Sequence, residues 1–431
     1  MIHKERNKFY PVESSWGYTR LKNIADYITR GNSPTYDSEG NIQVVNQACI
    51  NGYEVSLEHI KVHKDDDISL LKGRLQRGDL LMNSTGTGTL GRTAIFNHEG
   101  DNFIADSHIT IIRDSHKRFI PKYLHYYFND KQEMLTERCS RGATNQIEIQ
   151  RKELITLLVP SPLKVIQERI TAFLDKACAA IYGAIRTKQQ QLEVLDQLRK
   201  SIIHKAVTRG LDEKASLKYS GIQWIGAIPE HWRIEKLKRL LAEPLMYGTN
   251  EAAELDDPDL PRYIRITDFE ENGKLREDTF RSLPLDKAQG YYLSEDDLLF
   301  ARSGATVGKS FMFKNYVGAA CFAGYLIKAR TDHRRLNPEF LYYYTKSPCY
   351  EAWKEQIFTQ ATIQNISATK YAYLPVVLPP LKEQRQIVGF LEEKLSELEQ
   401  LGVNIFAQIT ALEQYRKSLI HECVTGKRRI E

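Results

Sequence analysis

The sequence predicts a mixed α/β fold, in which two duplicated α/β domains are separated by two long antiparallel coiled-coil helices. Three observations support this prediction. The chain of 431 residues matches itself at a shift of 217 residues. Two long stretches place apolar residues at every third or fourth position, which is typical of one face of a helix. The rest of each half contains short β-rich runs between turn residues.

The length and composition favour several folded domains. At roughly 150 residues per domain, the chain is too long for a single core. Hydrophobic residues make up 42% and charged residues 27%, which excludes a disordered or fibrous chain. The uncharged stretch at residues 316–327 is far shorter than the roughly 20 residues of a membrane span, and the polar start at residues 1–7 does not resemble a secretory signal. We therefore expect a cytoplasmic protein without a membrane partner.

The net charge and the cysteines indicate no particular chemistry. A net charge of +5 neither requires nor excludes a polyanionic partner, because phosphates are bound by a local patch. The six cysteines contain no C-x-x-C pair, so we expect buried reduced thiols rather than a zinc site or a disulfide framework. No metal site is predicted.

The internal repeat defines the domain organisation. At a shift of 217 residues, Arg199–His204 aligns with Arg416–His421, and this register holds without a gap over some 47 positions. A period of this length indicates duplicated domains, since solenoid repeats are only about 20 to 50 residues long. The predicted segments are a first α/β domain at 1–159, a first long helix at 160–210, a linker at 211–228, a second α/β domain at 229–378 and a second long helix at 379–431.

Each well-matched segment predicts a helix of about 45 residues, or about 65 Å at 1.5 Å per residue. A single helix cannot cover its own apolar stripe, so the two similar helices are expected to pack against each other as an antiparallel pair. The stripe residues are Ile170, Phe173, Ala177, Ile181, Ala184, Leu192, Leu195, Leu198, Ile202 and Ala206 in the first helix, and Ile387, Leu391, Leu395, Leu398, Leu401, Ile405, Ile409, Leu412, Tyr415 and Leu419 in the second.

The two variable segments are expected to contain matching strands and short helices. Tyrosines on the helical pattern, at 126–127 and 342–344, are expected in the core. The predicted strands are 42–45, 79–82, 93–96 and 108–112 in the first half, and 263–266, 297–300, 310–313 and 325–328 in the second, and the predicted helices are 121–128 and 338–344.

Two glycine motifs resemble nucleotide-binding sequences. Residues 86–91 match the dinucleotide fingerprint and residues 304–310 resemble a phosphate loop, but strand-like residues follow both motifs where a helix N-terminus is required. Signatures of zinc proteases, of serine hydrolases and of adenine methyltransferases are absent from the sequence. We therefore expect a tight hairpin in each half, whose small residues let the backbone approach a phosphate chain, and no catalytic residue.

Over essentially its whole length the sequence resembles the specificity subunits of type I restriction-modification systems. The resemblance rests on the duplication and on the runs Trp224–Trp232, Pro379–Ile387 and Lys417–Gly426, whereas residues 162–169 at the start of the first helix match less closely. It implies a non-catalytic DNA reader with two target recognition domains, each of which reads one half of a split sequence in double-stranded DNA, held apart by the helix pair.

The same resemblance implies partner subunits. Two methyltransferase subunits would bring S-adenosylmethionine, and restriction subunits would bring ATP and Mg²⁺ chemistry, while the chain itself needs no cofactor. The alternatives are a nucleotide-dependent enzyme and a structural adaptor without DNA reading.

Base-reading residues are expected in three matched loops of the two halves. Arg, Asn and Gln can bond purine edges through two hydrogen bonds. For any one of them, a structural role in a cap or a turn is an equal alternative. The candidates are Asn46, Gln47, Asn83, Thr87, Arg92, Arg141, Thr144, Asn145 and Gln146 in the first half, and Arg265, Asp268, Arg302, Ser303, Lys309, Gln360, Thr362, Gln364 and Asn365 in the second.

Overall fold

The computed structural model describes residues 16–430 apart from 65–67, 69–70, 87, 143–146, 271–272, 305 and 360–364. The chain divides into two compact units. Unit 1 contains Met1–Lys188 and Ala407–Glu431, and unit 2 contains Gln189–Phe406. Each unit therefore combines a variable α/β segment with parts of both long helices.

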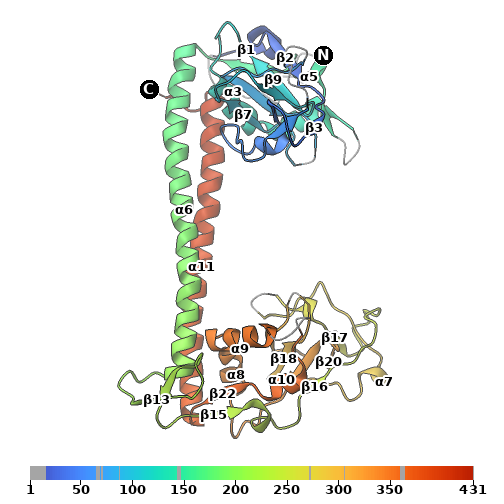
Figure 1. The fold of residues 1–431 in the computed structure, drawn as a ribbon, viewed down its shortest axis with the longest axis vertical. Helices are drawn as coiled ribbons and strands as arrows, with labels where there is room; N and C mark the ends of the chain where they lie inside the picture. Colours follow the sequence, from blue (N-terminus) through green and yellow to red (C-terminus); the bar gives the residue numbers. More distant parts are fainter. Residues whose placement is uncertain are drawn as a thin grey trace. The chain divides into compact units, whose positions relative to one another are not determined.

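Two four-stranded sheets form the α/β part of unit 1 (Figure 1). The antiparallel sheet has the order β2-β9-β6-β7, and the other has the order β3-β5-β4-β8 with β4 and β8 parallel. The strands are β1 (Gly17–Arg20), β2 (Tyr27–Arg30), β3 (Tyr36–Asp37), β4 (Ile42–Val45), β5 (Lys61–His63), β6 (Asp79–Asn83), β7 (Thr93–Phe96), β8 (Phe103–Ala105), β9 (Ile109–Arg113), β10 (Ser140–Arg141), β11 (Glu148–Ile149) and β12 (Leu158–Ser161). The short helices are α2 (Leu21–Ile24), α3 (Pro121–Asp130), α4 (Gln132–Cys139) and α5 (Arg151–Leu154).

Unit 2 repeats this plan. Its antiparallel sheet has the order β16-β21-β18-β19, and β17 pairs in parallel with β20 as β4 does with β8. The strands are β13 (Leu217–Tyr219), β14 (Ala227–Pro229), β15 (Arg233–Lys236), β16 (Met246–Tyr247), β17 (Arg262–Ile264), β18 (Asp297–Ala301), β19 (Ser310–Phe313), β20 (Ala320–Phe322), β21 (Leu326–Ala329) and β22 (Pro375–Leu378). The short helices are α7 (Leu285–Ala288), α8 (Pro338–Tyr344), α9 (Pro348–Thr359) and α10 (Ala368–Ala372). Across the expected linker at 211–228, β13 pairs with β14 as a small hairpin that extends to Pro229.

The predicted strands and helices are confirmed, with small changes at their ends. Strands β4, β7 and β19 and helix α8 have the predicted bounds. The other predicted strands and the helix at 121–128 differ by one or two residues at one or both ends. The long helices, at Lys164–Arg209 and Leu381–Val424, are shorter than the predicted 160–210 and 379–431. Two of these differences are informative, because His108 and Tyr325, predicted as first strand residues, instead lie in the turns before β9 and β21.

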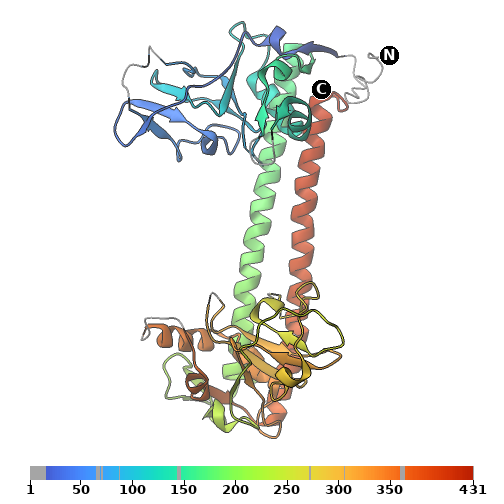
Figure 2. The same ribbon diagram turned by 90° about the vertical axis from the view of Figure 1, so that its right-hand side faces the viewer.

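The two long helices are α6 (Lys164–Arg209) and α11 (Leu381–Val424). In unit 1, residues 164–188 of α6 lie beside residues 407–424 of α11, and in unit 2, residues 189–209 lie beside residues 381–406 (Figures 1 and 2). Since the first part of one helix lies beside the last part of the other in each unit, the pairing is antiparallel, as predicted.

Each helix leaves part of its apolar stripe exposed. This corrects the expectation that each helix would cover the stripe of the other. Stripe residues such as Ile181 and Leu391 are buried. However, Leu198, Leu401 and Tyr415 are 44%, 50% and 52% exposed. One helix covers only a narrow seam of its partner, and these stripes are broader than such a seam.

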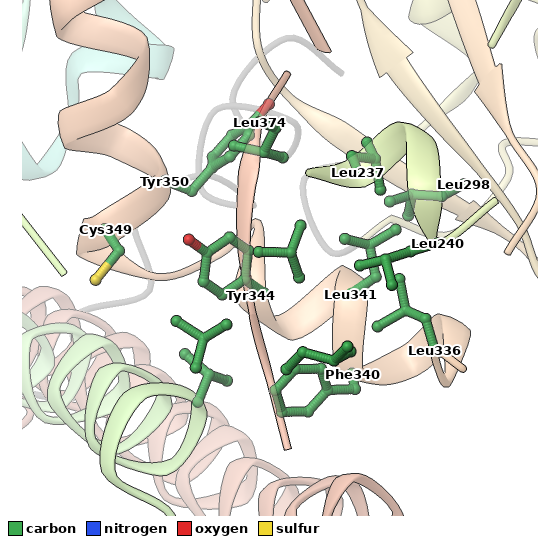
Figure 3. Close-up of a cluster of buried hydrophobic side chains, with 14 of the residues drawn as sticks. Leu237, Leu240, Leu298, Leu336, Phe340, Leu341, Tyr344, Cys349, Tyr350 and Leu374 are labelled. Carbon is green, nitrogen blue, oxygen red and sulfur yellow. The ribbon is translucent and has the colours of Figure 1, made fainter. Parts of the chain in front are cut away.

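The core of unit 2 joins the helices to the sheet (Figure 3). Phe340, Leu341 and Tyr344 of α8 pack in one cluster with Leu298 of β18 and with Ile387 of α11. The Tyr344 hydroxyl donates to the backbone oxygen of Pro375 at 2.6 Å. The repeat-equivalent hydroxyl of Tyr127 in unit 1 donates to Leu158 O at 3.2 Å.

The prediction of core tyrosines is confirmed for three of the five residues. These are Tyr126, Tyr127 and Tyr344, whereas Tyr342 and Tyr343 are half-buried.

A buried glutamine fixes the start of each long helix to its α/β segment. Gln384 is fully buried; its Oε1 accepts from Asn337 N at 2.7 Å and its Nε2 donates to the backbone oxygens of Arg335 and Pro379. Gln167 makes the equivalent bonds in unit 1, from Ile120 N and to Pro162 O. The repeated glutamine thus positions each helix start against the segment before α3 or α8.

Two repeat-equivalent glycines allow the backbone to come close to a neighbouring strand. A Cβ on Gly31 would lie 2.0 Å from Ala105 O, and one on Gly248 would lie 2.2 Å from Phe322 O. A side chain at either position would therefore push the neighbouring segment away. The contacted oxygens belong to Ala105 and Phe322, the last residues of β8 and β20, shortly before the turns that hold His108 and Tyr325.

The six cysteines are buried free thiols, as expected. Burial raises the pKa of the Cys139, Cys349 and Cys423 thiols to about 11, so these thiols stay protonated at neutral pH. No helix in the described part of the chain has the length and apolar character that crossing a membrane requires.

Candidate nucleic-acid interface

Three loops of unit 1 meet at one surface. Gln47, which follows β4, donates from Nε2 to Thr85 O at 2.6 Å and to Thr85 Oγ1 at 2.9 Å. Thr85 belongs to the glycine loop between β6 and β7, and it forms a β-bridge with Glu148 of β11. Gly86 N also donates to Ile147 O at 3.1 Å. The first loop, the glycine loop and the β10–β11 loop are thus joined by direct hydrogen bonds.

Two of the three equivalent loops of unit 2 meet in the same way. Ser303 of the glycine loop forms a β-bridge with Asn365, and Ile366 N donates to Arg302 O at 2.9 Å. The first loop, at residues 265–269 after β17, instead packs on strand β19, since the rings of Phe269 and Phe311 stack with centroids 4.3 Å apart. Each unit therefore presents one surface that is built from three matched loops.

A fourth segment completes each surface, and the sequence reasoning did not select it. Ser84 N donates to His108 O at 2.8 Å, and Arg302 N donates to Tyr325 O at 3.0 Å. His108 is exposed and Tyr325 is 65% exposed. The 217-residue shift aligns His108 with Tyr325, so the sequence contains the match that could have selected this segment. Both residues are predicted as strand positions, which is why the segment was not among the loops.

Several candidate side chains are already used inside the protein. Asn46 is buried; its Oδ1 accepts from Ala48 N and its Nδ2 donates to His59 O. Asn83 is fully buried. Asp268 is also buried and pairs with Arg265, 2.7 Å between Oδ1 and Nη2.

Arg92 and Lys309, at the ends of the two glycine loops, line clefts. Arg92 lines a cleft of about 1290 Å³ in unit 1 together with Lys417, and Lys309 lines a cleft of about 710 Å³ in unit 2 together with Lys200. The two pairs are equivalent in the 217-residue register. In the second cleft, burial lowers the pKa of Lys346 to about 8, and its Nζ donates to Ser310 O at 2.7 Å.

The candidates that remain at the loop surface are exposed or half-buried. The side chain of Arg141 is 77% exposed. The Arg302 guanidinium lies 4.8 Å from the centre of the Tyr247 ring and donates to Gly324 O at 3.4 Å. Gln47, Ser303 and Asn365 are half-buried. The other candidates lie outside the described residues: Thr87, Thr144, Asn145, Gln146, Gln360, Thr362 and Gln364.

The glycine loops do not have the geometry of nucleotide sites. Gly86 and Gly304 have φ values of 91° and 80°, which L side chains rarely adopt. Strands β7 and β19 follow these loops, whereas a phosphate site of this kind needs a helix N-terminus. Among the described residues, no group of three or more His, Cys, Asp or Glu side chains could hold a metal ion.

Comparisons with known proteins agree on one family. Residues 247–408 match the family model of the type I restriction modification DNA specificity domain. The putative type I restriction enzyme MjaX specificity subunit of Methanocaldococcus jannaschii is 22% identical, over 100% of this chain and 98% of that protein. The EcoKI specificity subunit of Escherichia coli K12 is 24% identical, over 47% of this chain and 44% of that protein.

Solved structures share the fold. One chain, from work on complex assembly and conformational transition of the type I R-M system, has a TM-score of 0.76 at 17% identity and covers 96% of this chain and 99% of its own length. The HsdS subunit from Thermoanaerobacter tengcongensis has a TM-score of 0.57 at 17% identity, over 97% of this chain and 99% of that subunit.

Proposed function

Because the chain belongs to the family of type I restriction-modification specificity subunits, we propose that it reads a split DNA target with one loop surface in each unit. Members of this family are the DNA-recognition components of their systems and not the catalytic ones. The alternative of a nucleotide-dependent enzyme is not favoured, since strands follow both glycine loops.

One observation supports this function above the others. The same four segments occur in both units, and three of them meet through matching backbone hydrogen bonds, while the side chains that they present differ. Unit 1 presents Gln47, Arg141 and His108, whereas unit 2 presents Arg302 and Tyr325. DNA sequence is read by side chains at base edges. Two copies of one scaffold with different side chains are therefore suited to two different half-sites.

The candidate residues divide into two groups under this proposal. Those at the loop surface, such as Gln47, Arg302 and Asn365, are the proposed base readers. Asn46, Asn83 and Asp268 instead hold the loops in shape through their buried contacts. Arg92 and Lys309, at the clefts, are proposed to contact the DNA backbone, because a cation at a phosphate contributes affinity without reading sequence.

The proposed partners follow from the family and from the charge of the chain. Two methyltransferase subunits would supply S-adenosylmethionine, and restriction subunits would supply ATP and Mg²⁺ chemistry. A net charge of +5 provides limited basic surface, so tight and specific binding should need the methyltransferase partner. The chain alone should bind DNA weakly, and its affinity should fall steeply with salt.

Methylation mapping tests the proposal. Cells that carry the chain and its methyltransferase partner should methylate one motif made of two short specific parts with unspecified bases between them. Cells with the partner alone should lack this methylation. A continuous motif, or methylation that is independent of the chain, would contradict the proposed function.

A further inference from the structure

The turn between β8 and β9 holds a histidine that is fixed on one side of its ring. His108 is exposed, and its Nδ1 lies 2.8 Å from Thr85 Oγ1. The same hydroxyl oxygen accepts from Gln47 Nε2 at 2.9 Å. The other ring nitrogen, His108 Nε2, has no hydrogen-bond partner among the residues that the structure describes. A chain of hydrogen bonds thus runs from the first loop through the glycine loop to the turn.

These contacts leave room for a continuous chain of donors and acceptors. In the arrangement that we assign, the Thr85 hydroxyl accepts from Gln47 and donates its own proton to His108 Nδ1. A neutral imidazole that accepts at Nδ1 carries its proton at Nε2. In this arrangement the exposed nitrogen of His108 is a hydrogen-bond donor.

The backbone of the turn is held in place as well. Asp106 is 4% exposed, and its carboxylate accepts from His108 N at 2.5 Å and from the Tyr36 hydroxyl at 3.0 Å. His108 O accepts from Ser84 N of the glycine loop. A donor whose backbone and ring are both fixed loses little conformational entropy when it binds.

The repeat supports a role in recognition rather than in folding. Tyr325 occupies the equivalent position in unit 2, and its backbone oxygen makes the equivalent hydrogen bond with Arg302 N. The exposed side chain differs between the units while the backbone contacts are kept. A position that varies in this way on a constant scaffold is suited to setting specificity.

We propose that His108 reads a purine in the half-site of unit 1, with its Nε2–H donating to the N7 edge of that base. This inference rests on the proposed function. A purine N7 is an acceptor that projects into the major groove. A single fixed N–H donor within a cluster of polar loops suits a base edge, whereas phosphate contacts come mainly from Lys and Arg. Thr85 acts as a positioning residue that fixes the tautomer and the ring.

The test measures DNA binding by the complex of the full chain with its methyltransferase partner. Every base pair of the mapped motif is changed in turn, for wild type, His108→Ala and the control His116→Ala, which removes an exposed histidine outside the loop surface. His108→Ala should lose discrimination at one base pair of one half-site by roughly tenfold, and His116→Ala should behave as wild type. Thr85→Val should relax specificity at that same base pair.

An atomic substitution in the DNA identifies the acceptor. A 7-deazapurine at that base pair, which replaces N7 by CH, should weaken wild type roughly tenfold and leave His108→Ala unchanged. Unaltered specificity of His108→Ala, an equal loss on all sequences with a smaller salt dependence, or no effect of the 7-deazapurine would overturn the assignment. If the wild-type complex shows no sequence preference at all, it is the proposed function that fails.

Discussion

Replacing Gln384 with leucine should destabilise unit 2 by about 3 kcal/mol, if its three buried hydrogen bonds position α11 as described. The side chain is fully buried, and its bonds to Asn337 N, Arg335 O and Pro379 O are 2.7, 3.0 and 2.9 Å long. Leucine has a similar size but leaves one N–H and two carbonyl groups without this partner. Each lost bond costs about 1 kcal/mol.

Calorimetry of the full chain can measure this change. For a unit of this size, about 3 kcal/mol corresponds to a fall of roughly 6–12 °C in the Tm of its transition. Gln386→Leu is the matched control, since Gln386 is exposed on the same helix and should change the Tm little. Gln167→Leu removes only two bonds and should lower the other transition by about 2 kcal/mol. Equal Tm values for the Gln384 and Gln386 variants would refute the reasoning.

Two further predictions concern the scaffold. In urea unfolding, Gly31→Ala and Gly248→Ala should each destabilise their unit by about 3 kcal/mol or more, because the new Cβ would lie about 2 Å from a backbone oxygen. In the same assay, the control Gly183→Ala should stabilise its helix by about 0.5–1 kcal/mol, because the space around its Cβ is open. Burial lowers the pKa of His125 from 6.5 to about 4, so the unfolded chain takes up a proton before the folded chain does. The stability of unit 1 should thus be level above about pH 6.5 and fall by about 3 kcal/mol towards pH 4, and a His125→Gln variant that kept the same pH dependence in urea unfolding would contradict this.

Much of the fold could be predicted because the two halves of the chain repeat the same sequence pattern. A run such as Ser310–Phe313 is mostly apolar, short and followed by turn residues, and its counterpart at 93–96 has the same pattern. The long helices were evident from their stripes. The exposure of Leu401 was not evident, because apolar periodicity locates a stripe on a helix but does not show how much of that stripe the partner helix covers.

The candidate site was only partly predictable. The three loops were selected because they match between the halves, and the structure brings them together. The roles of Asn46 and Asp268 depend on which groups are buried around them, which no local pattern records. His108 was missed because it lies directly before β9. The sequence pattern does not distinguish the first residue of a strand from the last residue of the turn before it.

Domain exchange tests the central claim most directly, that each unit reads its own half of the target. Residues 216–378 would be replaced by the corresponding segment of a related chain with a different known motif, and methylation would be mapped in cells that carry the methyltransferase partner. One half of the motif should change to that of the donor, and the other half should stay as it was. A change in both halves, or in neither, would contradict independent reading by the two units.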